Sequence, residues 1–161
     1  MKQAEVAAPN STLAGIFFLM FLVTGKQFAV DLNRVEQIIE YQPPTRTPRR
    51  PPCIEGVIEH RRRFLAVISL RQRLGVADPG PAHPAILLLK GIGRDPLVGL
   101  VVDQVVRVIS LPLDGVLPPP PRVFGIRAEF IRGVANAGGR PVVWLDEERL
   151  LMSTEPVTLL V

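Results

Sequence analysis

The sequence contains an internal repeat, and this feature constrains the fold more than any other. Residues 53–75 and residues 130–151 share one pattern when Gly56 is aligned with Gly133 and Arg63 with Arg140. Such self-similarity indicates that one structural unit is used more than once, and a solenoid would need at least about three copies. Two copies therefore predict two similar small β-subdomains.

Each copy has the same order of segments. In the first, two apolar runs at 54–58 and 64–68 flank the polar turn Glu59–Arg63, a pattern typical of a hairpin. A short helical signal follows at Leu70–Leu74, and Gly75 is a suitable C-terminal stop. Upstream, a second match pairs FAVDLNRVEQII at 28–39 with VGLVVDQVVRVI at 98–109.

Length and composition fit a β-rich domain. The chain has 161 residues, 47% of them hydrophobic, and its 17 prolines and 13 glycines favour many short strands over long helices. We expect a loose leader at 1–12, a single domain at 13–151 and a tail at 152–161. The domain would divide into two pseudo-repeated barrels at about 13–77 and 85–151.

The apolar run Leu13–Val23 admits two interpretations. Its eleven residues suit a signal-peptide core but are fewer than the roughly 20 that a membrane span needs. Because no small-residue cleavage site follows, we interpret it as a buried strand at 14–24, paired with a second strand at 26–31 in a cytoplasmic protein.

The segment after Asp31 has helical spacing. Leu32, Val35 and Ile38 recur at every third position, and Asp31 suits an N-cap, so a helix of at most two turns is expected. By the repeat, residues 102–108 would form the matching short helix.

Residues capable of catalysis are few. The two histidines, His60 and His83, are well separated in the chain, and Cys53 is the only cysteine. Acid–base or nucleophilic catalysis needs such a group held by a second one, and a zinc site needs several ligands, so we expect no enzyme activity, metal or cofactor. The net charge of +4 and the run Arg61–Arg63 leave a basic SH3-like barrel that binds nucleic acid as the alternative. With one tryptophan and one tyrosine for stacking, recognition of a protein surface is favoured.

Four segments, in order and at fitting spacing, resemble the CheW-like coupling domain of bacterial chemosensory systems. They are FAVDLNRVEQI, IEGVIEHRRRFLAVISLR, GLVVDQVVRVISL and FIRGVANAGGRPVVWLDEERLL, and the spacing from Tyr41 to Gly56 also fits. Departures fall mainly in the hairpin, where Glu59 replaces the family's Asn and Arg62 its Gly. Because arginine at positive φ is costly, we expect Arg62 to change the hairpin turn.

The resemblance implies a mainly β fold of two packed five-stranded SH3-like β-barrel subdomains with short helices. It implies a non-enzymatic adaptor in the cytoplasm, recruited to membrane-bound receptor arrays without inserting into the membrane. Its partners would be the cytoplasmic tip of a chemoreceptor and the regulatory domain of a CheA-type histidine kinase. By resemblance, the receptor groove would involve Val35, Ile38, Ile54, Gly56, Val57, Arg61 and Arg62. Val102, Val105 and Val108 would be mostly core, and a place in the lining of that groove is the alternative for them.

Overall fold

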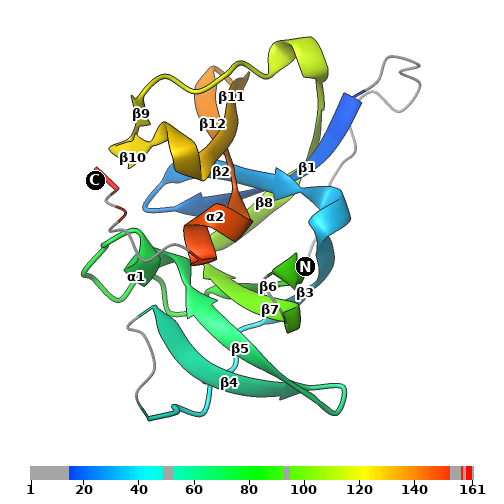
Figure 1. Cartoon of the computed structure of the whole chain (residues 1–161), viewed down its shortest axis with the longest axis vertical. Helices are drawn as coiled ribbons and strands as arrows, with labels where there is room; N and C mark the ends of the chain where they lie inside the picture. The colour runs from blue at the N-terminus through cyan, green and yellow to red at the C-terminus, as the bar shows by residue number, and fades with distance from the viewer. Residues whose placement is uncertain (1–14, 49–52, 93–94, 153–156, 158, 161) are drawn as a thin grey trace.

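The computed structural model describes residues 15–48, 53–92, 95–152, 157, 159 and 160, and the expected leader at 1–12 lies outside them. The fold is mainly β, with two five-stranded sheets (Figure 1). Sheet A has the strand order β11-β12-β2-β1-β8, and sheet B has the order β3-β6-β7-β5-β4.

The strands of sheet A are β1 (Gly15–Val23), β2 (Lys26–Asp31), β8 (Gln104–Pro112), β11 (Ile131–Ala137) and β12 (Arg140–Leu145). Those of sheet B are β3 (Val35–Glu40), β4 (Ile54–His60), β5 (Arg63–Ser69), β6 (Ala85–Ile92) and β7 (Asp95–Val102). A separate pair is formed by β9 (Arg122–Val123) and β10 (Ile126–Arg127). Short helices are α1 (Leu70–Arg73), α2 (Glu147–Met152) and the 3-10 turns η1 (Leu32–Arg34), η2 (Leu113–Gly115) and η3 (Ala128–Phe130).

Each sheet takes strands from both sequence copies. Parallel pairing of β2 with β12 brings the first hairpin into sheet A, and parallel pairing of β5 with β7 brings the 85–102 hairpin into sheet B. As domain boundaries, the ranges 13–77 and 85–151 stay a prediction. The described residues of the expected tail form no strand. Val157 and Leu159 are nevertheless buried, and Leu159 N–H donates to the carbonyl of Leu74.

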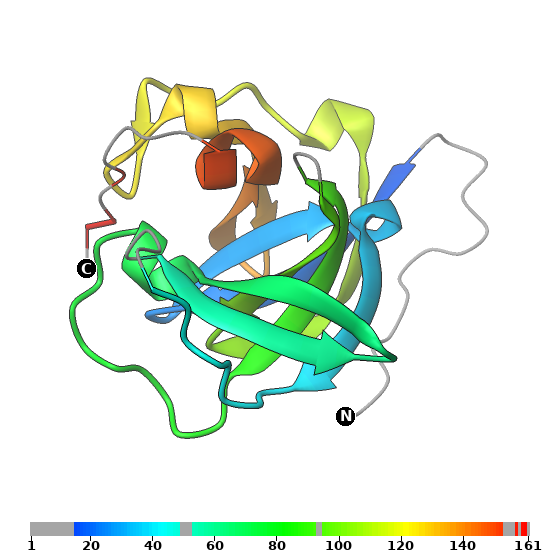
Figure 2. The same cartoon turned by 60° about the horizontal axis from the view of Figure 1, so that its bottom comes forward.

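Neither sheet is a closed barrel, but side chains bridge the opening of sheet B. The hydroxyl of Tyr41, just after β3, donates to Glu55 at 2.6 Å, and His60 Nε2 lies 3.2 Å from Gln37 Oε1. These contacts link the two end strands β3 and β4, whose curvature is visible in Figure 2. Burial and the bond to the Glu55 carboxylate raise the pKa of Tyr41 to about 12.

Three apolar clusters form the core. The largest lies between the two sheets and includes Leu19, Phe21 and Phe28 of sheet A together with Leu87 and Leu100 of sheet B. A second cluster is formed by side chains on the other face of sheet B. A third is formed by side chains on the other face of sheet A, where Phe18 contacts Trp144 edge-on at a centroid distance of 4.9 Å. Burial of apolar side chains from both sequence copies in one cluster makes the two sheets a single folded unit.

The prediction of a helix after Asp31 is wrong beyond its first turn. Asp31 does cap a turn, since its carboxylate accepts from Asn33 N–H at 2.9 Å, but this turn ends at Arg34 and residues 35–40 form β3. The register of β3 shifts between Val35 and Gln37, so one extra residue interrupts the alternation. This bulge places Val35 and Ile38, three residues apart, against the same cluster. In the sequence, apolar residues at that spacing resemble one face of a helix.

The prediction of a matching helix at 102–108 is wrong for the same reason. Val102 ends β7, and β8 begins at Gln104. The pairing of β8 with β1 shifts by one residue, with Val106 as the extra residue. The repeat aligns Val106 with Glu36, which is the extra residue of β3. The two copies therefore repeat a bulge, not a helix.

In each copy, the valine of the repeated Gly-Val pair forms a β-bridge to a residue of a neighbouring proline-rich segment. Val57 exchanges two backbone hydrogen bonds of 2.8 Å with Thr45, and Val134 exchanges two of 2.9 Å with Leu117. Gly56 has φ of 151°, and a Cβ there would lie 2.2 Å from the carbonyl oxygen of Thr45. A side chain at this position would push the covering segment off the edge of β4.

Both hairpins turn through two residues with positive φ. In the first these are Arg61 (51°) and Arg62 (63°), and in the second Gly138 (63°) and Gly139 (74°). The expected change of turn at Arg62 is therefore absent, because this arginine takes the same left-handed backbone conformation as its glycine counterpart.

We predict that Gly56→Ala lowers the free energy of unfolding by about 2 kcal/mol or more, because the new methyl group collides with the backbone of Thr45. Urea titration followed by circular dichroism measures the loss. The control is Gly138→Ala, which also has positive φ but nothing within 4 Å of the added Cβ, and it should lose only about 1 kcal/mol. Equal losses would show that close approach to Thr45 is unimportant.

Candidate functional site

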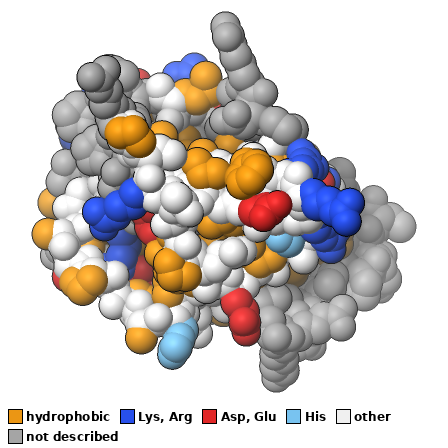
Figure 3. Space-filling model, turned by 90° about the horizontal axis from the view of Figure 1, so that it is seen from below, with side chains coloured by type: hydrophobic (Ala, Val, Ile, Leu, Met, Phe, Trp, Pro, Cys, Tyr) orange, Lys and Arg blue, Asp and Glu red, His pale blue; other side chains and the backbone are white. Residues whose placement is uncertain are grey.

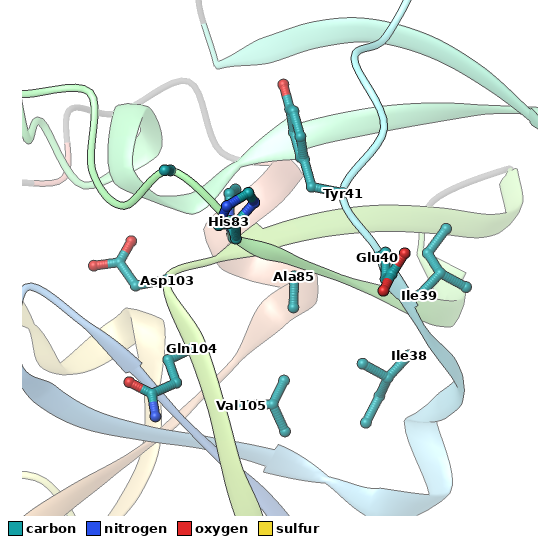
Figure 4. A pocket seen from close by; sticks show the side chains of 11 residues that line it. Ile38, Ile39, Glu40, Tyr41, His83, Ala85, Asp103, Gln104 and Val105 are labelled. Carbon is teal, nitrogen blue, oxygen red and sulfur yellow. The ribbon is translucent and has the colours of Figure 1, made fainter. Parts of the chain in front are cut away.

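A cavity of about 690 Å³ lies where the end strands β3 and β8 of the two sheets come together. We call it the seam cavity; its lining residues are Ile38, Ile39, Glu40, Tyr41, Ala82, His83, Pro84, Ala85, Asp103, Gln104 and Val105. Figure 4 shows that they come from β3 and the residue after it, from the loop before β6 and the first residue of β6, and from the β7–β8 corner. The cavity is thus built from both sheets.

The floor of the seam cavity is apolar and its edge is polar. Ile38 and Val105 are partly buried and pack against the central cluster, as does Ala85. Glu40, His83 and Gln104 are exposed at the edge (Figure 4). An apolar centre with a polar rim is typical of a protein-binding surface.

Arg71 fixes one end of the cavity. It follows β5, and its guanidinium donates two bonds to Asp103, from Nε at 2.6 Å and from the second terminal nitrogen at 2.8 Å. Its other terminal nitrogen pairs with Asp78, and Asp103 also accepts from Thr24 N–H at 2.8 Å. The hydrogen bond to Asp103 raises the pKa of Arg71, so this clamp stays charged and joins α1, the β7–β8 corner and the β1–β2 turn.

A second ion-pair cluster joins η1 to α2. Arg34 lies 3.4 Å from Glu147 through Nε and 2.9 Å from Glu148 through a terminal nitrogen. Glu147 is only 2% exposed, and its Oε2 has no hydrogen-bond partner among the described residues. Burial raises the pKa of Glu147, and the nearby Arg34 opposes this only in part. The helix α2 also meets α1, since Arg73 Nε donates to the carbonyl of Leu150 at 2.6 Å.

The residues suggested by resemblance lie on the two end strands of sheet B, β3 and β4, and at the tip of the β4–β5 hairpin. Of these, Ile38 lines the seam cavity, while Val35 and Ile54 pack against the central cluster. Gly56 is buried, and Val57 carries the bridge to Thr45 on the outer edge of β4. The remaining two, Arg61 and Arg62, are exposed at the tip of the β4–β5 hairpin, away from the cavity lining.

The sequence offered one signal for the rest of the cavity. The repeat aligns Val105 with Val35, so it points to β8 as the counterpart of β3. Nothing local distinguished Tyr41, His83 or Gln104, because their place in the lining depends on how the two sheets approach each other.

The described residues contain no group of three or more His, Cys, Asp or Glu side chains that could hold a metal ion. His60 contacts an amide, and His83 is exposed. In the part of the chain that is described, no helix has the length and apolar character needed to cross a membrane. The fold and the seam cavity together are those of a small two-sheet β-domain with an apolar surface cavity, as protein-binding domains have.

Comparison with known proteins makes this assignment more specific. The family model "CheW-like domain" matches residues 18–155, and the chain belongs to that family. It is 28% identical over 152 residues to the chemotaxis protein CheW of Klebsiella aerogenes, covering 94% of this chain and 91% of that protein. It is 30% identical over 123 residues to the protein FrzA of Myxococcus xanthus, covering 76% and 75%.

A solved structure supports the fold independently. The scaffolding protein TtCheW from Thermoanaerobacter tengcongensis superposes with a TM-score of 0.78, covering 88% of this chain and 90% of that one. At 24% sequence identity this likeness concerns the fold. The family and fold expected from the sequence are both confirmed.

We predict that Glu147→Gln makes stability less dependent on pH. Because burial raises the pKa of Glu147, the folded state binds its proton more tightly than the unfolded state. This contribution is full below the unfolded pKa and is lost as the pH rises through the folded pKa. Wild type should therefore gain stability relative to the variant as the pH falls from neutral into the acid range, measured by urea titration at each pH.

The matched control is Glu148→Gln, which removes a 44% exposed carboxylate from the same arginine. If both variants differ from wild type in the same way at every pH, burial of Glu147 is not the cause.

Proposed function

We propose that this protein is a non-enzymatic adaptor that couples a chemoreceptor to a CheA-type histidine kinase. The observation that carries the proposal is the seam cavity, whose apolar floor is bounded by two end strands of different sheets. Family membership supports it, since the relatives named above include a chemotaxis protein and a scaffolding protein. Family membership gives no support to the nucleic-acid alternative.

In this proposal the seam cavity receives the cytoplasmic tip of the receptor. Ile38 and Val105 would supply apolar contact, while the edge residues Glu40, His83 and Gln104 would fix the orientation of a helical partner. The regulatory domain of the kinase would bind elsewhere on the sheets. The adaptor would act in the cytoplasm and be recruited to membrane-bound receptor arrays.

Coupling of this kind needs no chemistry in the adaptor. A ligand shifts an equilibrium only by the difference between its affinities for the two states. The adaptor would therefore bind the active and inactive forms of the kinase with unequal affinity, and receptor binding would change that difference. The ion pairs of Arg71 and Arg34 would hold the two sheets in a fixed relation. A partner that binds at the seam cavity would then displace both sheets together.

The first experiment is capture of partners by the purified full chain from a lysate of the source cells, with identification by mass spectrometry. Recovery of both a chemoreceptor and a histidine kinase supports the proposal. Recovery of nucleic acid alone, lost at high salt, would overturn it in favour of the nucleic-acid alternative.

We predict that Val105→Glu abolishes capture of the receptor, because a carboxylate would be desolvated against an apolar partner. The matched control is Val106→Glu, one residue along β8, which is 39% exposed and does not line the cavity. Thermal melting followed by circular dichroism checks both folds. If Val105→Glu unfolds, Gln104→Trp is the second test, since it fills the exposed edge of the cavity. Undiminished capture by the folded variants would place the receptor site elsewhere.

A further inference from the structure

A cavity of about 210 Å³ lies at the β1–β2 turn and takes its lining from three segments that are far apart in the sequence. We call it the turn pocket; its lining residues are Thr24, Gly25, Lys26, Gln27, Phe124, Arg140 and Pro141. The segments are the β1–β2 turn, the turn between β9 and β10, and the start of β12 (Figure 1). The turn pocket shares no lining residue with the seam cavity, so it is a separate site.

Two cations line the turn pocket, and neither forms an ion pair with another described residue. The amine of Lys26 lies 5.0 Å from the centre of the Phe124 ring, a cation–π contact. The guanidinium of Arg140 donates one hydrogen bond, of 2.5 Å, to the carbonyl of Gly25. An ammonium has three donors and a guanidinium has five, so most of these N–H groups have no acceptor in the described part of the chain.

The described lining of the turn pocket contains no aspartate or glutamate to offset this charge. Asp103 accepts a hydrogen bond from Thr24 N–H at 2.8 Å, but its charge is already balanced by the ion pair with Arg71. Elsewhere the two signs are mixed, since the face seen in Figure 3 carries both basic and acidic side chains. The turn pocket therefore has a local excess of positive charge, which attracts an anion.

Buried contacts hold the two cations in place. Gln27 is only 8% exposed, and its side-chain nitrogen donates to three carbonyl groups of the β11–β12 hairpin at 3.3 to 3.4 Å. These bonds fasten the start of β12, and with it Arg140, to the β1–β2 hairpin. The ring below Lys26 is anchored as well, because Phe124 packs edge-on against Phe28 at a centroid distance of 6.2 Å. A site organised in advance loses little conformational entropy when a ligand binds.

Phe124 occupies a turn position that glycine adopts more easily. Its φ is 51° and that of Gly125 is 85°, as in a two-residue type I′ turn. A residue with a Cβ loses free energy in this conformation. Backbone strain of this kind gathers at binding sites, and here it falls on the residue that supplies the aromatic wall of the turn pocket.

We propose that the turn pocket binds a small phosphate-type anion, either inorganic phosphate or the phosphate group of a small phosphomonoester. This inference goes beyond the adaptor function and does not rest on it. Lys26 and Arg140 would each donate charge-assisted hydrogen bonds to the phosphate oxygens. A phosphate group carries a charge of about −1.5 to −2 at neutral pH, which matches two cations better than a carboxylate does.

A small ligand fits the turn pocket better than a polyanionic surface does. Recognition of an anionic membrane typically uses a cluster of about four to eight basic residues, and nucleic acid is held through many phosphate contacts. The turn pocket offers two cations in one recess, which is enough for a single phosphate group.

The test is titration of the isotope-labelled full chain with sodium phosphate and, separately, with glycerol 3-phosphate, followed by nuclear magnetic resonance. Saturable shifts of the amide signals of Thr24, Gly25 and Lys26 are expected, with a Kd in the millimolar range or below. Sodium chloride at the same ionic strength should leave these signals in place, because screening alone does not fill the site. Shifts that never saturate, or that sodium chloride reproduces, would overturn the proposal.

Variants assign the binding to the two cations. Lys26→Gln and Arg140→Gln each remove one charged donor, so each should raise the Kd about tenfold or more. Lys26→Arg keeps the charge and should bind within about twofold of wild type. The matched control is Arg107→Gln, which removes an exposed arginine of β8 outside the lining and should bind as wild type does. If Arg140→Gln unfolds for lack of its bond to Gly25, Lys26→Gln still decides the question, since Lys26 has no hydrogen bond to another described residue.

The remaining outcomes each have one meaning. An unchanged Kd in the folded glutamine variants would overturn the site, and an equal loss in Arg107→Gln would show that net charge alone is responsible. Vesicles containing phosphatidylglycerol and a DNA duplex are the competing probes. Binding of either probe that depends on Lys26, without binding of phosphate or glycerol 3-phosphate, would overturn the proposal in favour of a membrane or nucleic-acid surface.

Discussion

Two parallel strand pairs hold this molecule together. Pairing of β2 with β12 and of β5 with β7 links the two sequence copies, because each copy supplies strands to the sheet of the other. The central cluster depends on this exchange, since Phe28 of the first copy and Leu100 of the second are buried in the same interior. The seam cavity depends on it too, because it lies where the end strands β3 and β8 meet.

The repeat is expressed in local geometry as well as in topology. Bulges recur at Glu36 and Val106, and an isolated bridge recurs at Val57 and Val134. The ion pairs of Arg71 and Arg34 tie α1 and α2 to the opposite copy through carboxylates. The hairpin tips are where the copies part, with two arginines in one and two glycines in the other. A difference at an exposed turn leaves the core unchanged, because neither tip contributes a side chain to the apolar clusters.

The seam cavity and the hairpin tip expose different kinds of side chain. The cavity offers partly buried apolar side chains in a fixed frame, whereas the tip offers charge on a projecting hairpin. Both are carried by sheets that pack on one central apolar cluster.

The sequence by itself determined most of the strands, both hairpins, the short helix after β5 and the family, because alternation, turn residues and self-similarity are local or repeated signals. It misassigned residues 35–39, since a bulge in a strand spaces apolar residues as a helical turn does. Only the tertiary structure decided which strand pairs with which, and therefore that Val105 and His83 share a cavity with Ile38. Strand pairing between distant segments is set by burial in a common core, and no stretch of neighbouring residues encodes it.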